Sequence, residues 1–223
     1  MGAKQEAADW VAAVSKYGER HDLRYEPVGG INPVDAPVAL CVGGVNRLTG
    51  QLAEGFWGSS CDADEKELGG LFNKAVLPTA LLAKAHMPDL AKVVPAFNVE
   101  SVEGAEHVAQ RFSRKVEFES IDFNKRFWTT VPKEYDPVSL RELFSPGFLA
   151  WVTTMSGEID FGVNDRQLWF MWRLKERGEE ELKAALKNAG QLFRRLQAEM
   201  EESGIHTYQP GPWHAGLEPF PDA

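Results

Sequence analysis

The segment from Glu179 to Gly204 has the most regular helical pattern in the sequence. Its apolar side chains recur at steps of three and four residues and form one stripe along Leu182, Ala185, Leu186, Ala189, Leu192, Phe193, Leu196 and Met200. A run of glutamates begins at Glu179, at the positive end of the helix dipole, and Gly204 supplies a stop signal. At a rise of about 1.5 Å per residue such a helix extends about 37 Å. A stripe of that length needs a broad apolar surface, so we expect the helix to lie across a whole sheet.

The clearest strand pair is a hairpin over residues 158–172. Apolar side chains alternate in its first half, and a polar turn at 164–166 precedes a returning strand. Further apolar runs predict strands or strand–turn units at 38–42, 45–50, 51–57 and 116–131. The polar stretch 59–70 predicts a loop or a frayed helix start, and 71–94 is compatible with strand or helix.

Further helices are indicated by their ends and by their periodicity. Residues 4–17 are amphipathic, and Gly18 predicts the end of that helix. Asp136-Pro137 predicts a helix start, because aspartate caps free amides and proline needs no N–H at the first helical position. Residues 103–112 are a further short helical candidate.

Strands and helices do not alternate regularly along the chain, which favours an α+β fold over a doubly wound parallel sheet. We expect a mixed or antiparallel sheet with the long C-terminal helix packed on it. Residues 1–206 are expected to form one globular unit, and the alternative is two similar small subdomains that meet near 101–106. Residues 207–223 are rich in proline and are expected to form a tail.

The chain is acidic, with 24 Lys and Arg against 33 Asp and Glu and a net charge of −9. Such a surface lacks the counterion release that drives most binding to DNA or RNA, so nucleic acid is not an expected partner. The most apolar window, 75–97, is interrupted by prolines and charges, so we expect no membrane span. Cys41 and Cys61 form no Cys-x-x-Cys motif, and no secretory signal is found, so a cytoplasmic protein is expected.

The sequence contains no recognisable catalytic, metal or cofactor motif. Its five histidines include no His-x-x-x-His pair, so neither a metal site nor a cofactor is expected. Glu158 and Asp160 share one face of their strand and could act as acid and base. We favour the simpler interpretation, in which they belong to an exposed polar face of the hairpin.

The most distinctive stretch runs from Glu119 to Phe127 and reads Glu-Ser-Ile-Asp-Phe-Asn-Lys-Arg-Phe. The strand alternation changes phase there, which predicts a bulge or a short loop near Glu119-Ser120. The stretch resembles an uncharacterised, largely actinobacterial family that shares the pattern Glu-Ser-x-x-Phe-Asn-Arg-Arg-Phe, with Lys125 in place of an arginine. Some members carry membrane helices, and the family has no assigned activity. The resemblance therefore implies a shared fold unit and supplies no chemistry.

Two interpretations of this motif remain open. In the structural one, Phe123 and Phe127 fill the core. Asn124 bonds to local backbone at a bend, and Glu119 pairs with Arg126. In the functional one, Glu119, Asn124 and Arg126 line a groove that binds a ligand or a partner.

Three functions are compatible with these features. The leading hypothesis is a non-enzymatic interaction or scaffold module that binds another protein or itself. Its aromatic candidates are Trp213 in the tail and Trp169, since Trp169 and Trp172 have opposite parity on one strand and at least one is expected at the surface. The alternatives are a small-molecule or lipid-binding domain with a pocket between sheet and long helix, and a hydrolase that uses scattered carboxylates and a histidine.

Overall fold

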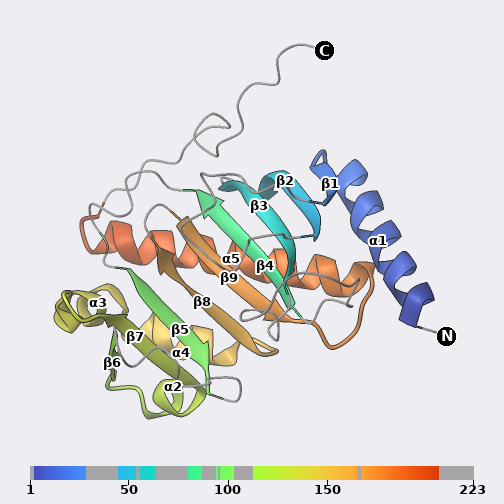
Figure 1. Ribbon diagram of the computed structural model, residues 1–223. Coiled ribbons are helices and arrows are strands. Elements are labelled where there is room, and N and C mark those ends of the chain that lie inside the picture. The colour runs from blue at the N-terminus through green and yellow to red at the C-terminus, as the bar shows by residue number, and fades with distance from the viewer. Residues whose placement is uncertain are drawn as a thin grey trace.

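Nine strands of the described residues form one antiparallel sheet at the centre of the molecule (Figure 1). The structure is a computed structural model and describes residues 3–28, 45–53, 56–63, 80–86, 94, 96–102, 113–164 and 167–205. The strand order is β1-β2-β3-β4-β9-β8-β5-β7-β6, and each neighbouring pair is antiparallel. The predicted α+β class is confirmed, and of the two predicted alternatives, a mixed or an antiparallel sheet, the structure has the antiparallel one. The sheet is continuous from strands before residues 101–106 to strands after them, because β4 pairs with β9.

The bounds of the elements are as follows. The strands are β1 (Arg24–Val28), β2 (Val45–Ala53), β3 (Phe56–Ala63), β4 (Ala80–His86), β5 (Phe97–Ser101), β6 (Ser113–Val116), β7 (Phe127–Pro132), β8 (Ile159–Asn164) and β9 (Gln167–Arg173). The helices are α1 (Ala3–Arg20), α2 (Ile121–Arg126), α3 (Pro137–Leu143), α4 (Pro146–Thr154) and α5 (Glu179–Glu202).

The two faces of the sheet differ in what packs against them. All the described helices add buried side chains to one large apolar cluster on the helical face, among them Trp10 of α1, Phe123 of α2, Leu140 of α3, Phe148 of α4 and Leu186 of α5. Figure 1 shows α4 and α5 behind the sheet, on this side. The opposite side, toward the viewer, is called the front face here. Its buried apolar cluster is small and consists of Cys61, Leu82 and Trp169, with Met171 packed against it.

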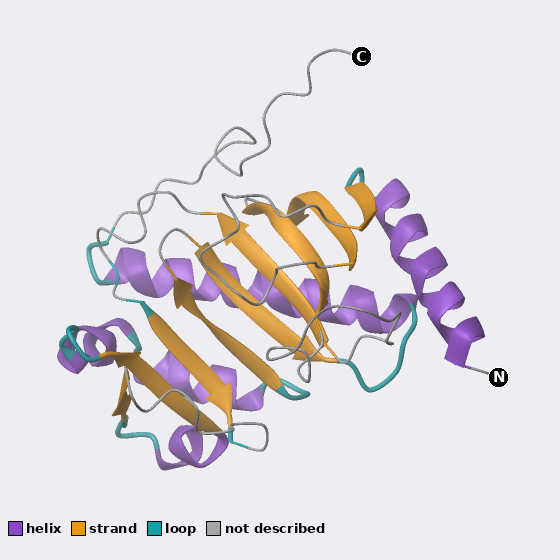
Figure 2. Cartoon of the chain, viewed as in Figure 1, coloured by secondary structure: helices purple, strands orange, loops and turns teal. Residues whose placement is uncertain are grey.

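The C-terminal helix α5 packs on the sheet, as predicted, and contacts strands β2, β4 and β9 (Figure 2). All eight residues of the predicted stripe are buried. They pack with strand residues such as Phe56, Leu81 and Phe170 in the same cluster. These side chains pack between the sheet and the helix, which is the place predicted for the alternative pocket.

Local sequence signals set several element ends as predicted. Asp136 caps α3 by accepting a hydrogen bond from the N–H of Val138 at 2.9 Å. Ser145 caps α4 by accepting one from the N–H of Phe148 at 3.1 Å. Gly204 follows α5 with a φ of +76°, a conformation that glycine adopts without strain. The predicted hairpin is also confirmed, since β8 and β9 pair along their whole length.

Helix α1 continues past Gly18 to Arg20, so the predicted stop at Gly18 is wrong. A Cβ at this position would lie 2.8 Å from Cδ2 of Leu48, so glycine here allows α1 to approach β2 closely. The chain turns away two residues later, where Asp22 has a φ of +54°.

The phase change near Glu119-Ser120 arises from a short loop at residues 117–120 and a short helix that follows it. Of the two predicted alternatives, the short loop is confirmed and the bulge is wrong. The helix α2 occupies Ile121–Arg126 between β6 and β7. Ser120 caps it by accepting a hydrogen bond from the N–H of Phe123 at 3.3 Å. Residues 59–63, predicted to begin a polar loop, belong instead to β3.

Several predictions fall on residues that the structure does not describe. They concern the strand at 38–42, the helix at 103–112, Cys41, and the tail 207–223 with Trp213. Among the helices that the structure describes, none combines the length and the apolar character needed to cross a membrane.

Candidate binding site on the front face of the sheet

A row of neighbouring residues crosses the centre of the front face. Strand pairing places Thr49 of β2 opposite Ser59 of β3, Ser59 opposite Lys84 of β4, and Lys84 opposite Trp169 of β9. Residues in such a row point to the same side of a sheet, so the four side chains share the front face. Gln167 lies two residues from Trp169 on β9 and therefore points to the same side.

Three polar side chains of this region are buried and have no hydrogen-bond partner among the described residues. Lys84 is 3% exposed, Thr49 is 6% exposed and Gln167 is 7% exposed. The unsatisfied atoms are Lys84 Nζ, Thr49 Oγ1 and Gln167 Oε1. Buried polar groups are hydrogen-bonded in the great majority of proteins, because leaving them unpaired costs about 1–3 kcal/mol each. Their occurrence together makes this part of the front face the strongest candidate for a binding site.

Trp169 lies beside Lys84 and is only 6% exposed. A Cβ on Gly162 of β8 would come within 2.8 Å of its Nε1 atom, so glycine makes room for the indole ring. Trp172 points to the helical face, where its indole donates to Oε1 of Glu181 at 2.9 Å. Trp169 and Trp172 point to opposite faces of the sheet, as their positions along the strand predicted. Both rings are buried, so the prediction that at least one of them is exposed is wrong.

The predicted carboxylate pair Glu158 and Asp160 also lies on the front face, near the ends of β8 and β9. Asp160 is buried, which corrects the expectation of an exposed polar face. It accepts a hydrogen bond from the N–H of Ser101 at 2.7 Å and pairs with the guanidinium of Arg173 at 3.2 Å. Glu158 pairs with Arg173 as well, at 3.5 Å.

Glu100 interacts with the same cluster of charged side chains, namely Asp160 and Arg173. Burial raises the pKa of Glu100, the nearby Asp160 raises it further, and Arg173 lowers it. Asp160 and Glu158 both share Arg173, so this group has the arrangement of a structural ion-pair network. A raised pKa alone does not make it a catalytic site.

The residues of the distinctive motif mainly hold the β6–α2–β7 region together. The side chain of Asn124 accepts a hydrogen bond from the N–H of Phe118 at 3.1 Å and donates one to its carbonyl oxygen at 2.6 Å. Phe123 and Phe127 are buried in the apolar cluster. These contacts agree with the structural interpretation for these three positions.

Arg126 reaches away from its own helix. Its guanidinium donates to the carbonyl oxygens of Thr153 and Gly157, the latter at 2.8 Å. It therefore connects α2 to the end of α4. Glu119 is exposed, just before α2. The two residues do not lie with Lys84 and Trp169, and a role of Glu119, Asn124 and Arg126 in ligand binding remains a proposal.

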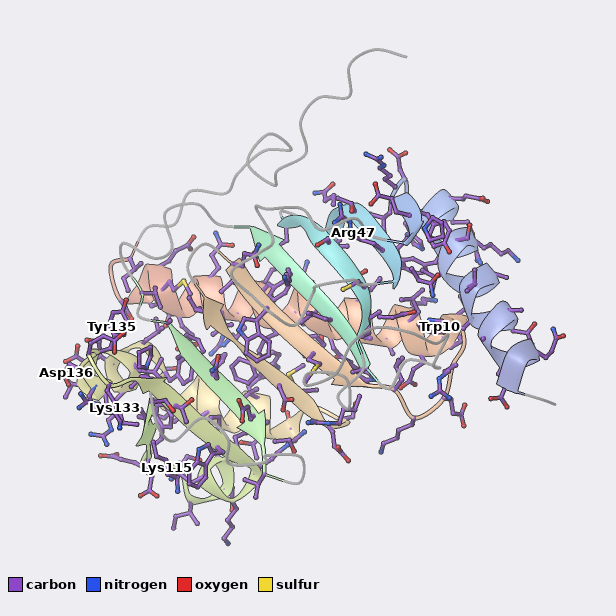
Figure 3. All side chains as sticks on the ribbon, in the orientation of Figure 1. Trp10, Arg47, Lys115, Lys133, Tyr135 and Asp136 are labelled. Carbon is purple, nitrogen blue, oxygen red and sulfur yellow. The ribbon has the colours of Figure 1, made fainter. Side chains whose placement is uncertain are left out.

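A second buried polar network lies on the helical face. The indole of Trp10 donates to both oxygens of Asp62, at 3.0 and 2.9 Å, and the amide of Asn46 donates to Oδ2 at 2.7 Å. Burial raises the pKa of Asp62 to about 6, although the hydrogen bonds from Asn46 and Trp10 lower it in part. Both oxygens of this carboxylate have a partner, so the network holds α1 against the sheet. Figure 3 labels Trp10 on α1.

Lys84, Gln167 and Thr49 are not among the site residues that the sequence patterns predict. In the sequence Lys84 is only one of the charges that interrupt an apolar window. A signal was available, because a lysine in the middle of the apolar run Ala-Leu-Leu-Ala-Lys-Ala is unusual for a central strand. Among the described residues, no cluster of three or more His, Cys, Asp or Glu side chains could hold a metal ion.

Comparisons with known proteins find a similar fold but no matching family. No protein-family model matches the chain, and a search of curated protein sequences finds no match. A solved structure does match: the mycobacterial trehalose monomycolate transport factor A, TtfA, with a TM-score of 0.59 and 10% sequence identity. The match covers 85% of this chain and 95% of that chain. At this identity the similarity establishes a shared fold.

Proposed function

We propose that the chain is a non-enzymatic factor in lipid transport that works by binding a protein partner. The match to TtfA over 85% of this chain and 95% of that chain carries the proposal. TtfA is described as a transport factor for trehalose monomycolate, a sugar that bears a long acyl chain. A match over this share of both chains means that the two proteins have most of their architecture in common, and this is compatible with a similar task.

The surface at the α2–α3 end, formed by Glu119, Ile121, Tyr135 and Val138, is the proposed docking site for the protein partner. Ile121 is 68% exposed, and Val138 and Tyr135 are also well exposed. The side chain of Arg141 on α3 donates to the carbonyl oxygen of Glu117, which ties α3 to the chain just before α2. Figure 3 shows Tyr135 at this end of the molecule. Exposed apolar residues at one end of a protein are suited to a partner interface.

The edges of the sheet are poor sites for self-association by strand addition. At one edge β6 is four residues long, and its Lys115 pairs with Glu117 at 2.7 Å and lies over the ring of Trp128. At the other edge β1 contains Pro27. Short, charged or proline-containing edge strands discourage pairing between sheets. We therefore favour a different protein as the partner.

The transport role is tested by depleting the protein in the organism that encodes it and measuring extractable surface lipids against total lipids. We expect one acylated sugar to fall at the surface while its cellular pool rises, and the wild-type gene should restore both. An unchanged distribution would overturn the proposal.

The partner surface is tested by site-specific photo-crosslinking. A photoreactive residue at Ile121 should form a discrete adduct in cells, and Val138→Glu should abolish it. The matched control is Val11 on α1, an exposed apolar residue at the β1 end of the sheet. Equal adducts from both positions, or none from Ile121, would contradict this docking site.

A further inference from the structure

We infer that the front face binds the sugar head group of a glycolipid at Lys84, Gln167 and Trp169. The inference names the ligand class of the proposed transport function and rests on that function for the choice of a glycolipid. The polar chemistry of the site is independent of it. That chemistry is given by the unsatisfied atoms Lys84 Nζ, Gln167 Oε1 and Thr49 Oγ1.

The unsatisfied atoms require a ligand that both donates and accepts hydrogen bonds. The amino group of Lys84 can only donate when it is charged, whereas Oε1 of Gln167 can only accept. An inorganic anion such as phosphate is mainly an acceptor at neutral pH, and it has no apolar face that could stack on Trp169. A hydroxyl group both donates and accepts, so a polyhydroxylated ligand satisfies Lys84 and Gln167 together, and the hydroxyl of Thr49 can serve as either partner.

The surroundings of these atoms suit a sugar better than a simple alcohol. Trp169 lies next to Lys84 in the row, and a flat indole ring offers an apolar surface to the C–H face of a sugar. The row from Thr49 to Trp169 spans three strand intervals, about 14 Å at the usual spacing, which is an extent that a disaccharide covers. The small apolar cluster of Cys61 and Leu82, with Met171, lies beside the row and can receive the start of an acyl chain.

Asp160 and Glu158, carboxylates that the structure describes on this face, have cationic partners other than Lys84. Asp160 and Glu158 are paired with Arg173, and Asp160 also accepts from the N–H of Ser101. Lys84 is therefore left with polar capacity that the described carboxylates on its own face do not use. Low exposure also strengthens hydrogen bonds to a ligand, because water competes less.

The test is a calorimetric titration of the full chain with octyl β-D-glucoside below its critical micelle concentration, and with trehalose. We expect saturable binding of both, with the glucoside bound more tightly. Tetraethylene glycol monooctyl ether, which has the same chain without a sugar, should bind at least tenfold more weakly than the glucoside. Inorganic phosphate should not bind.

Two substitutions locate the site. Lys84→Met and Gln167→Met keep the side-chain volume but remove the polar atoms, so each should weaken sugar binding at least tenfold. Both variants should unfold at the same or a higher temperature than the wild type, because they remove unsatisfied buried groups. Lys187→Met on the exposed side of α5 is the matched control and should bind normally.

Several results would overturn the inference. These are unchanged binding by Lys84→Met, equal binding of the ether and the glucoside, preferential binding of phosphate, or no sugar binding by the wild type. If the titrations show no sugar binding while depletion still alters the lipid distribution in cells, this inference is wrong and the proposed function is still supported.

Discussion

The indole N–H of Trp10 on α1 donates to both carboxylate oxygens of Asp62 on β3, at 3.0 and 2.9 Å. Asn46 of β2 adds a third hydrogen bond to this carboxylate, and Tyr25 of β1 donates to Asn46 at 2.9 Å. One buried carboxylate thereby links the N-terminal helix to three adjacent strands.

Asp62 should make the stability of the fold depend on pH. Its pKa is raised from 3.8 to about 6, so the folded state binds this proton more tightly than the unfolded state. The contribution is therefore fully present below the unfolded value and is lost as pH rises through about 6. A shift of two units corresponds to about 3 kcal/mol at most.

Urea unfolding of the wild type and of Asp62→Asn, between about pH 4 and about pH 7, measures this contribution. Other carboxylates affect both proteins equally and cancel in the difference. The free energy of unfolding of the wild type minus that of the variant should decrease as pH rises. A difference that is constant with pH would show that Asp62 titrates normally.

Arg126→Ala should destabilise the fold by about 2 kcal/mol, because it leaves the carbonyl oxygens of Thr153 and Gly157 without their charged donor. Glu119→Ala, an exposed position of the same motif, should change the free energy of unfolding by less than about 0.5 kcal/mol. Chemical denaturation of both variants gives the comparison. A fully stable Arg126→Ala protein that has lost partner binding would instead support the groove interpretation of the motif.

Asn124→Asp should cost about 2–3 kcal/mol, although the two side chains have nearly the same shape. The amide of Asn124 donates to the carbonyl oxygen of Phe118 at 2.6 Å, and a carboxylate would place an unprotonated oxygen there. Asp122→Asn, on the exposed side of the same helix, is the control and should be neutral. Equal melting temperatures for the two variants would argue against the backbone pairing by Asn124.

Gly162→Ala should lower stability by about 3 kcal/mol. The added Cβ would lie 2.1 Å from the carbonyl oxygen of Phe97 and 2.8 Å from Nε1 of Trp169, so backbone or ring must move. Gly178→Ala has open space and an extended backbone, and should cost no more than about 1 kcal/mol, because alanine is a poorer N-cap than glycine for α5. Thermal unfolding measures both, and a tolerated Gly162→Ala would mean that β8 and β5 can separate easily.

The sequence predicted the elements whose signals are local. The ends of α3 and α5 follow from Asp136 and Gly204, and the stripe of α5 follows from the spacing of its leucines. These features depend only on residues within a few positions of each other, so periodicity and capping rules are sufficient.

The motif illustrates where local patterns mislead. A helix of six residues between two strands changes which apolar side chains alternate along the chain, just as a bulge does. The pattern around Glu119 therefore did not predict α2. The helix end predicted at Gly18 is wrong for a related reason. Glycine is needed there because Leu48, on a strand distant in sequence, approaches the helix closely.

The fold class, the long helix and the hairpin can be predicted from the amino-acid sequence, because they follow from short-range order in the chain. Which polar residues are buried depends on how distant parts of the chain pack together. Lys84, Thr49 and Gln167 come from three strands far apart in sequence, and they share one face because β2, β3, β4 and β9 pair in a particular register. Pairing between distant strands depends on the whole core, so no local pattern around Lys84 could show what lies beside it.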